Sequence, residues 1–215
     1  MSAAASEPSA LELDTTGTPA ATMYRLLTSL IVPRPIAWVS TRSATGVDNL
    51  APHSWFTQAS VDPPCIVFTS VGEKDTLRNI RATGDFVVNI VDEHVREAMN
   101  LTAADAPAEV DEFRLAGVTA QPARRVGAAR VAEAPAHLEC TCEQLVDVGD
   151  ATLVIGRVVQ VHIAAGVRGP DGADAALLRP VARLSGSAYA SLGEIVTTPR
   201  PSWQDVLDAR DGTDG

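Results

Sequence analysis

Several classes of protein are excluded by what this sequence lacks. No run approaches the roughly 18 to 20 apolar residues that a membrane-spanning helix needs. The first twenty residues have neither the basic start nor the apolar stretch of a secretory signal. Only three cysteines occur in 215 residues, too few for a disulfide framework, which agrees with a reducing compartment. We therefore expect a cytoplasmic protein with no membrane partner.

Positive charge is scarce as well. The chain has 17 Lys and Arg against 27 Asp and Glu, which gives a formal charge of −10. Its basic residues are scattered singly, whereas a nucleic-acid surface needs them in clusters. We therefore expect small-molecule partners and no nucleic acid. Lys74 is the only lysine, and the other sixteen basic residues are arginines. The general preference of this chain for arginine explains part of the scarcity of lysine.

Motifs for metals and dinucleotides are missing too. Cys140 and Cys142 lie two apart in an alternating apolar stretch, so they share one face of a strand without the usual spacing of metal ligands. We interpret them as core or sheet residues, and we expect no metal. No glycine-rich dinucleotide fingerprint or phosphate loop follows any apolar run. A bound cofactor would therefore be held by other means.

What is present indicates one globular domain. Apolar residues make up 46% of the chain and charged residues 20%, with no shift in composition that would divide it. Residues 1–20 are small, polar and acidic without periodicity, so we expect a disordered arm there. We expect the folded domain over 21–200 and an acidic tail over 201–215, frayed from Asp205 to Gly215.

The hydrophobic pattern favours a mainly β fold. Short or alternating apolar runs bounded by Gly, Pro, Asn and Asp predict strands. They lie at 36–41, 49–60, 65–70, 86–91, 137–148 and 151–163. The first two and the last two are each expected to pair as a hairpin. Because the connections are of the hairpin type and the helices are short, we predict an antiparallel β-barrel with peripheral helices.

Short helices are expected at three places, 24–30, 75–82 and 93–101. In the second of these, Asp75 or Thr76 would cap the first turn and Gly84 would end the helix. The segment that follows the third helix reads as a loop-rich excursion. Glu112, Phe113 and Leu115 are its expected packing points.

The loop around Lys74 has the chemistry of a phosphate site. A phosphate monoester carries close to two negative charges near neutral pH and needs donors and positive charge to replace its water. Lys74 supplies the charge, while Thr69, Ser70 and Thr76 offer hydroxyls. The following helix adds unsatisfied amides at its N-terminus. Asp75 cannot contact a phosphate favourably, so it is assigned to the cap, with Asn79 bonding nearby backbone.

The order of several segments resembles that of a known family. The segments are Arg34-Pro35-Ile36-Ala37-Trp38-Val39-Ser40-Thr41, Asn49-Leu50-Ala51-Pro52-His53-Ser54-Trp55-Phe56, Asp62-Pro63-Pro64, Lys74-Asp75-Thr76 with Asn79-Ile80, Phe86-Val87-Val88-Asn89, Glu139-Cys140, Gly156-Arg157-Val158, and Arg183-Leu184 with Tyr189. In this order they resemble the flavin reductase-like proteins with an FMN-binding split barrel, which include the flavoredoxins. The resemblance implies a split β-barrel of the antiparallel Greek-key type, a homodimer, and one non-covalent FMN per subunit near the interface.

The resemblance also implies which residues hold FMN. Two segments, 38–41 and 49–54, would border the ring and ribityl chain, and the loop around Lys74 would surround the phosphate. The expected FMN-binding residues are Arg34, Trp38, Val39, Ser40, Thr41, Asn49, Leu50, Ala51, Pro52, Ser54, Thr69, Ser70, Lys74, Asp75, Thr76, Asn79, Arg183 and Tyr189.

Simpler roles stay open for several of these residues. Trp38, Trp55 and Phe56, taken singly, are more typical of a core than of a flavin wall. Arg34 could pair with a carboxylate of the partner subunit or approach the phosphate. His53 is the one candidate for a catalytic acid, although a histidine in a polar strand is more often simply hydrogen-bonded.

The function that follows from these observations is that of an NAD(P)H-dependent flavin reductase. Hydride would pass from the nicotinamide to flavin N5 and the electrons on to a second acceptor or a partner monooxygenase, which requires orientation of two rings and no catalytic triad. One alternative is an electron carrier that holds FMN tightly without NAD(P)H activity. Another is a specialised flavin-dependent step on a metabolite, because fold and cofactor do not determine the substrate.

Overall fold

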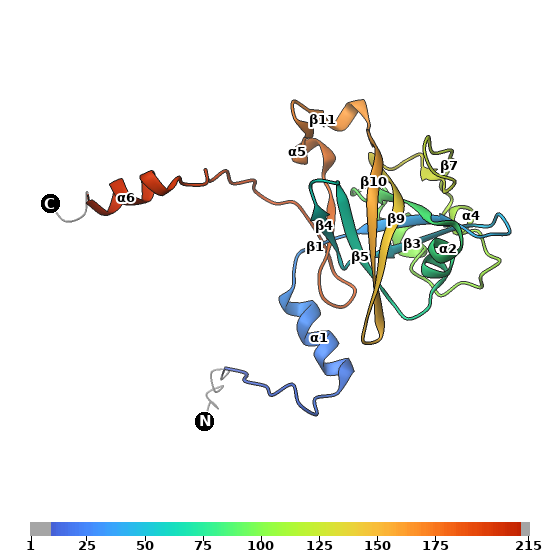
Figure 1. Ribbon diagram of the computed structural model, residues 1–215, viewed down its shortest axis with the longest axis horizontal. Coiled ribbons are helices and arrows are strands. Elements are labelled where there is room, and N and C mark those ends of the chain that lie inside the picture. Colours follow the sequence, from blue (N-terminus) through green and yellow to red (C-terminus); the bar gives the residue numbers. More distant parts are fainter. Residues whose placement is uncertain (1–9, 212–215) are drawn as a thin grey trace, which may run out of the picture.

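The computed structural model describes residues 10–211, and its centre is a curled antiparallel sheet of seven strands (Figure 1). The strands are β2 (Ala37–Arg42), β3 (Asp48–His53), β4 (Phe56–Ser60), β5 (Cys65–Val71), β6 (Asp85–Ile90), β9 (Ala136–Val148) and β10 (Ala151–Ile163). Their order is β3-β2-β6-β9-β10-β5-β4. Only Ser54 and Trp55 separate the two edge strands β3 and β4 along the chain, so the edges meet at a seam. The predicted antiparallel split barrel is confirmed.

Shorter elements surround this barrel. A second sheet has the order β1-β13-β14, and β7 with β8 and β11 with β12 form two-stranded pairs. These strands are β1 (Arg34–Pro35), β7 (Ala120–Gln121), β8 (Arg130–Val131), β11 (Arg168–Gly169), β12 (Gly172–Ala173), β13 (Val181–Arg183) and β14 (Tyr189–Ser191). The helices are α1 (Ala20–Leu30), α2 (Asp75–Thr83), α3 (Arg96–Leu101), α4 (Glu112–Ala116), η1 (Ala165–Val167), α5 (Ala175–Leu178) and α6 (Trp203–Asp211).

The predicted hairpin of the two long strands is confirmed as β9 and β10, of 13 residues each. Its turn includes Gly149, whose φ of +60° is readily adopted only by a residue without a Cβ. Gly156 on β10 has a packing role instead. A Cβ there would lie 2.3 Å from Cζ of Phe86, so the absence of a side chain leaves the space that this ring fills.

Strand β2 is buried on both faces because the sheet separates two apolar clusters. Ala37 and Val39 pack with Phe68, Phe86 and residues of α2 on one face. On the other face Trp38 packs with a cluster that includes Met99 of α3 and Phe113 of α4, and the indole N–H of Trp38 donates to Thr102 Oγ1 at 2.8 Å. Since both faces are covered, strand β2 does not show the alternation of a half-exposed strand.

Several expectations about local structure require correction. The second predicted strand, 49–60, is interrupted at Ser54 and Trp55, and its second half pairs with β5 instead of β2. The chain changes sheet edges at this point because the curled sheet has brought its two edges together. Phe113 is buried as expected, but Leu115 is 45% exposed and is not a packing point. The two cysteines Cys140 and Cys142 do lie in the core cluster on one face.

The ends of the chain extend away from the barrel as two arms (Figure 1). The expected helix at 24–30 is confirmed, but it begins earlier, at Ala20, inside the predicted disordered arm. Residues 1–9 of that arm and 212–215 of the predicted tail lie outside the described residues. The expectation of a frayed end is wrong for residues 205–211, which belong to α6 (Trp203–Asp211). Among residues 10–211, no helix is both long and apolar enough to cross a membrane.

Candidate functional site

A cavity of about 640 Å³ opens at the seam of the barrel. This volume lies within the roughly 300 to 1,000 Å³ typical of small-molecule sites. One wall is formed by β3 and the Ser54-Trp55 link, and another by the end of β5 with the first turn of α2. The loop around Asp105 and the start of α4 close the third side, and α1 contributes Tyr24. Segments far apart in the sequence therefore meet around one space.

Helix α2 begins at this cavity without a side-chain cap. Lys74 is the N-cap residue and makes no capping hydrogen bond, which corrects the expectation that Asp75 or Thr76 would cap the helix. Asp75 instead lies in the first turn, where its carboxylate pairs with Arg78. Gly84 ends the helix as predicted, with φ of +75°. The first-turn amides of a helix have no intrahelical partners and attract negative charge.

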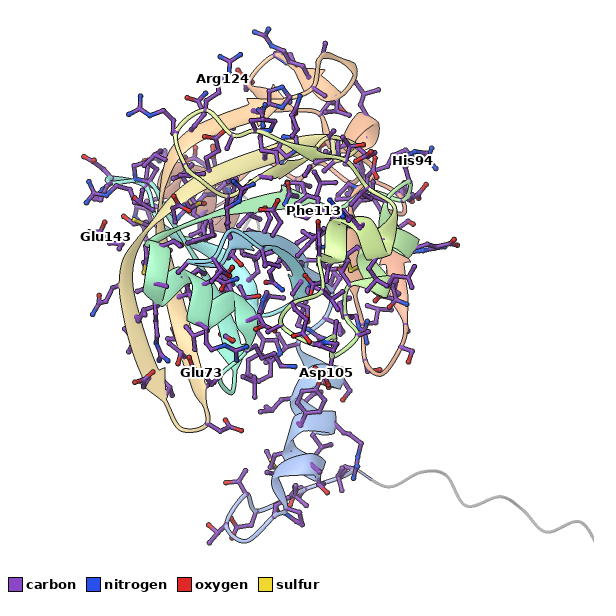
Figure 2. The ribbon with its side chains drawn as sticks, turned by 90° about the vertical axis from the view of Figure 1, so that its right-hand side faces the viewer. Glu73, His94, Asp105, Phe113, Arg124 and Glu143 are labelled. Carbon is purple, nitrogen blue, oxygen red and sulfur yellow. The ribbon has the colours of Figure 1, made fainter. Side chains whose placement is uncertain are left out.

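Lys74 reaches across the cavity to an acidic loop. Its Nζ lies 2.9 Å from Oδ1 of Asp105, and both side chains are exposed. The hydrogen bond from Lys74, together with its charge, lowers the pKa of Asp105. Figure 2 shows Asp105 and Glu73 at the end of the molecule from which α1 extends. The single lysine thus lines the cavity with a carboxylate as its partner, and its contact with a phosphate stays a prediction.

A buried chain of polar side chains runs beneath the first turn of α2. Thr76 Oγ1 donates to Asn49 Oδ1 at 3.2 Å, and Asn49 Nδ2 donates to Glu112 Oε2 at 3.1 Å. Asn79 Nδ2 donates to Thr41 Oγ1 at 3.0 Å, so Asn79 bonds a side chain and not the backbone as expected. Because each member holds its neighbour, this network fixes the helix start against β2 and β3.

His53 lies at the end of this network. Its Nε2 is 3.5 Å from Thr76 Oγ1, its Nδ1 is 3.3 Å from the carbonyl oxygen of Thr69, and its ring packs on Phe68 with centroids 4.7 Å apart. Burial lowers the pKa of His53 to about 4, with a smaller effect in the same direction from Lys74. The imidazole is therefore neutral near pH 7. Its role as a catalytic acid stays a prediction.

Glu112 is a cavity residue that sequence reasoning treated only as a packing point. It is buried, lines the cavity and accepts hydrogen bonds from Asn49 Nδ2 and from the backbone N–H of Leu50. Burial raises the pKa of this carboxyl. The only signal in the sequence was an acidic residue beside Phe113 at a helix start, which is too common to identify a site.

Many of the predicted FMN-binding residues line the cavity. They are Asn49, Ala51, Pro52, Ser54, Thr69, Lys74, Asp75 and Thr76. The structure adds two aromatic residues to this wall, Tyr24 and Trp55, whose ring centroids are 6.4 Å apart. Trp55 was considered more typical of a core than of a flavin wall, yet it is 39% exposed. It lies in the two-residue link between β3 and β4, where the chain changes sheet edges beside the cavity.

Other predicted residues lie in the protein core and do not line the cavity: Trp38, Val39, Ser40, Thr41, Leu50, Ser70 and Asn79. Trp38 has no exposed surface, so its side chain does not form a flavin wall in this structure. Ser40 Oγ donates to the carbonyl of Ala129, and Ser70 Oγ to the carbonyl of Gly72. Both hydroxyl groups therefore bond to the backbone, and they contribute to the site by fixing the segments around the cavity.

Arg34, Arg183 and Tyr189 lie together at a second, smaller cavity of about 190 Å³. Tyr24, Pro52, Ser54 and Ala103 line both cavities, so the two spaces share a wall. The late segment with Arg183 and Tyr189 therefore lies next to the main cavity and does not line it. The resemblance implied that this segment would be near the cofactor.

Comparison with known proteins identifies the family. Residues 29–178 match the family described as flavin reductase like domain. A protein of Halalkalibacterium halodurans is 39% identical over 191 residues, which cover 83% of this chain and 91% of that one. The crystal structure of nitrilotriacetate monooxygenase component B from Bacillus cereus is 35% identical, has a TM-score of 0.85, and matches 89% of this chain and 100% of its own.

A second solved structure is similar over the same region. Pseudomonas fluorescens 2-nitrobenzoate 2-nitroreductase NbaA is 29% identical with a TM-score of 0.84, and the match covers 90% of this chain and 98% of that one. The two solved structures thus match about nine tenths of this chain each. The chain belongs to the flavin reductase-like family.

Proposed function

We propose that this protein binds FMN non-covalently in the cavity at the seam and works as an NAD(P)H-dependent flavin reductase. When bound, FMN would supply the electron chemistry, which is the acceptance of hydride from the nicotinamide and the donation of electrons to a second acceptor. The observation that carries the proposal is the uncapped start of α2, which opens into a cavity beside Lys74. Uncapped first-turn amides beside a cation make a ready anion site.

The donors around α2 fit the phosphate of FMN. Lys74 contributes a charge, Thr69 a hydroxyl at the cavity wall, and the helix its first-turn amides. A phosphate would replace the carboxylate of Asp105 as the partner of Lys74. Since a phosphate near neutral pH carries more charge than a carboxylate and has three acceptor oxygens, this exchange favours the phosphate.

The other walls fit a flat ring. Tyr24 and Trp55 present aromatic surface, while Pro52 and the alanines that follow Thr102 are small and apolar. Neutral His53 and the Asn49 network offer hydrogen bonds without adding charge to the space. The chain's part in the reaction is to orient two rings and to hold water away from them, which requires no nucleophile.

We further propose a homodimer that passes reduced flavin to a partner monooxygenase. Support comes from the structural similarity to a protein named as component B of nitrilotriacetate monooxygenase. Exposed apolar residues on the two arms, including Leu30 at 75% and Val196 at 75%, are consistent with contacts to a second chain. An electron carrier that is inert to NAD(P)H would use the same cavity, and only the kinetics distinguish the two.

A second candidate function is the direct reduction of a small aromatic acid on the bound flavin. The observation that favours it is the second cavity, which adjoins the first and contains two arginines. The similarity to a 2-nitrobenzoate 2-nitroreductase is in line with this alternative. Here flavin would stay bound through the cycle instead of leaving as a product.

The test begins with the absorbance spectrum of the purified protein, followed by release of the flavin by heat and its identification. NADH and NADPH oxidation are then measured with added FMN and with added FAD. We expect FMN, in one equivalent per chain, and oxidation of one of the two nicotinamides. Activity no higher than that of free flavin, with a yellow protein that a partner reductase can reduce, would establish the carrier instead.

A further inference from the structure

The second cavity holds two guanidinium groups that face a common space. Arg34 belongs to β1 and Arg183 to β13, two strands paired residue by residue, Arg34 opposite Arg183. Both side chains line the cavity of about 190 Å³, together with Tyr24, Ser54 and Tyr189. Cross-strand neighbours of like charge are normally unfavourable. Their pairing here calls for a compensating group.

No carboxylate compensates them within the described part of the chain. Among the side chains that the structure describes, the ion pairs within 4.0 Å include neither Arg34 nor Arg183. Arg34 is only 6% exposed. Burial lowers the pKa of Arg34, and the charge of Arg183 lowers it further. Within residues 10–211, a chain with a net charge of −10 has thus brought two cations together with no carboxylate within 4.0 Å of either.

Both guanidinium groups are held rigidly by neutral acceptors. Arg34 donates to the carbonyl oxygens of Thr28, Ile31 and Leu184, each at 2.8 Å. Arg183 donates to the Tyr189 hydroxyl at 2.5 Å and stands over the Tyr189 ring, 4.7 Å from its centroid. These bonds fix the direction of each planar fork and leave both positive charges unneutralised. Arg34 also donates from Nε to Ser54 Oγ at 3.5 Å, so it contributes mainly its positive charge to the cavity. Arg183 uses fewer of its five N–H groups, and a pre-organised planar guanidinium suits carboxylate and phosphate oxygens.

A purely structural role explains part of this arrangement. The three carbonyl bonds of Arg34 hold the end of α1 against the segment after β13, and any rigid donor could do that. They do not explain why a second arginine lies opposite. Arg183 is half-buried, and its bonds to Tyr189 and Gly186 stay within its own hairpin. Two cations in one partly enclosed space are best explained by a negatively charged ligand.

We propose that Arg34 and Arg183 form an anion subsite that binds the carboxylate or phosphate of the molecule exchanging electrons with the flavin. The inference rests on the proposed function for its biological meaning. Because Tyr24, Pro52, Ser54 and Ala103 line both cavities, a ligand held by its anionic group at the arginines would extend its flat part over this wall into the main cavity. The arginines are therefore binding residues for the second substrate and not for the flavin phosphate, which lies by Lys74.

The first experiment measures binding of an aromatic carboxylate by calorimetry. Benzoate is compared with its neutral analogue benzamide, using the protein as purified and again after loading with FMN. Arg183→Gln removes one charge while keeping a polar side chain. Arg157→Gln is the matched control, since Arg157 pairs with Glu143, which Figure 2 places on the outer edge of the barrel away from Asp105. We expect Arg183→Gln to weaken benzoate binding about tenfold to a hundredfold, the range for a hydrogen bond to a charged group, and to leave benzamide unchanged.

The second arm distinguishes an aromatic acid from a nicotinamide dinucleotide as the source of the anion. The KM for NADH and NADPH is measured in the Arg183→Gln variant with a neutral acceptor. A raised KM with unchanged kcat assigns the arginines to the dinucleotide phosphates. An unchanged KM together with weaker benzoate binding assigns them to a carboxylate substrate. Both results support an anion subsite. Arg34→Lys keeps the positive charge but loses the planar guanidinium, so it should weaken binding of the anion less than Arg183→Gln does.

Three results would overturn the inference. In the first, wild-type protein binds benzoate no more tightly than benzamide and the KM values do not move. In the second, Arg183→Gln weakens FMN but not riboflavin, which would assign the arginine to the flavin phosphate. In the third, the variant changes the oligomeric state in sedimentation with unchanged benzoate binding, which would make the arginines an interface pair. The proposed function fails on a different result: the protein binds no FMN, whether or not it binds benzoate.

Discussion

The two adjoining cavities both contain positive charge, but they hold it in opposite ways. Lys74 is 56% exposed and has an acidic partner, Asp105, on a facing loop. Arg34 is 6% exposed, has no acidic partner among the described side chains, and is fixed by three carbonyl oxygens. An exposed ion pair contributes little to stability and exchanges partners easily. A buried and rigid guanidinium cannot be removed without disturbing the fold. The comparison predicts that charge in the first cavity serves binding alone, whereas in the second it serves both binding and stability.

The largest expected effect is on folding and concerns the second cavity. Arg34→Ala should lower the free energy of unfolding by about 3 kcal/mol or more, because each buried carbonyl left without a donor costs about 1 to 3 kcal/mol. Urea denaturation measures it. Arg42→Ala is the matched control, since Arg42 forms an exposed pair with Asp48 and should change stability by less than about 1 kcal/mol. Equal losses of stability in Arg34→Ala and Arg42→Ala would contradict the view that charge in the second cavity also stabilises the fold.

The next effect concerns the first cavity and is on binding alone. Lys74→Ala should weaken FMN by about 1.5 to 3 kcal/mol, or roughly tenfold to a hundredfold, and leave riboflavin unchanged because riboflavin has no phosphate. Quenching of flavin fluorescence gives both affinities. Arg81→Ala on the same helix is the control, since Arg81 pairs with Glu73 and does not line the cavity. If FMN and riboflavin lose affinity equally, Lys74 does not contact the phosphate.

A third prediction concerns pH and the neutral histidine of the first cavity. The pKa of His53 is about 4 in the folded protein, below the ordinary 6.5. Between these values the unfolded chain binds a proton that the folded chain does not, so stability falls as pH falls from about 6.5 to about 4, by up to about 1.4 kcal/mol per pH unit. Burial also lowers the pKa of His137 to about 4, so this residue adds a similar loss of stability on acidification.

The contribution of His53 can be isolated by substitution. His53→Gln should lose less stability than the wild type on acidification, measured by denaturation at several pH values. The matched control is His94→Gln, since His94 is exposed and lies at the periphery in Figure 2. The same pH dependence in wild type and His53→Gln would mean that the pKa of His53 is not lowered in the folded protein.

The smallest expected effect tests the exchange of partners by Lys74. Asp105→Asn removes the competing carboxylate, so FMN should bind slightly more tightly, by severalfold at most, and riboflavin should not change. The gain should disappear at high salt, because exposed charges are screened. Asp171→Asn, in an exposed turn between β11 and β12, is the control. A weaker affinity for FMN after Asp105→Asn would show that Asp105 orients Lys74 instead of competing for it.

Local pattern was sufficient to predict much of the fold. The hairpin of β9 and β10 was predictable because its alternation and its Gly149-Asp150 turn lie in one continuous stretch. The break at Ser54 and Trp55 was not, because it depends on the curled sheet bringing β3 and β4 together. Strand propensity says nothing about such closure.

The site was predictable only where its residues are neighbours in the sequence. Thr69, Lys74 and Thr76 were identified because they lie within one short stretch of the sequence, from the end of β5 to the start of α2, and all three line the cavity. The pairing of Lys74 with Asp105, 31 residues later, and the burial of Glu112 next to Asn49 depend on tertiary contacts. Trp38 shows the converse, because an aromatic residue in a matching segment faces the core on a strand buried from both sides.

Gly156 determines more than the packing of one ring. Phe86 projects from β6 into a space that exists only where β10 lacks a side chain, and the neighbours of Gly156 on that strand are Ile155 and Arg157. If β10 slipped by one residue, a branched or charged side chain would take the place of the gap and meet the ring. The glycine therefore disfavours a pairing shifted by one residue, because a side chain at this position would clash with the ring of Phe86. Since β10 also pairs with β5, the same alignment sets Thr69 at the cavity wall.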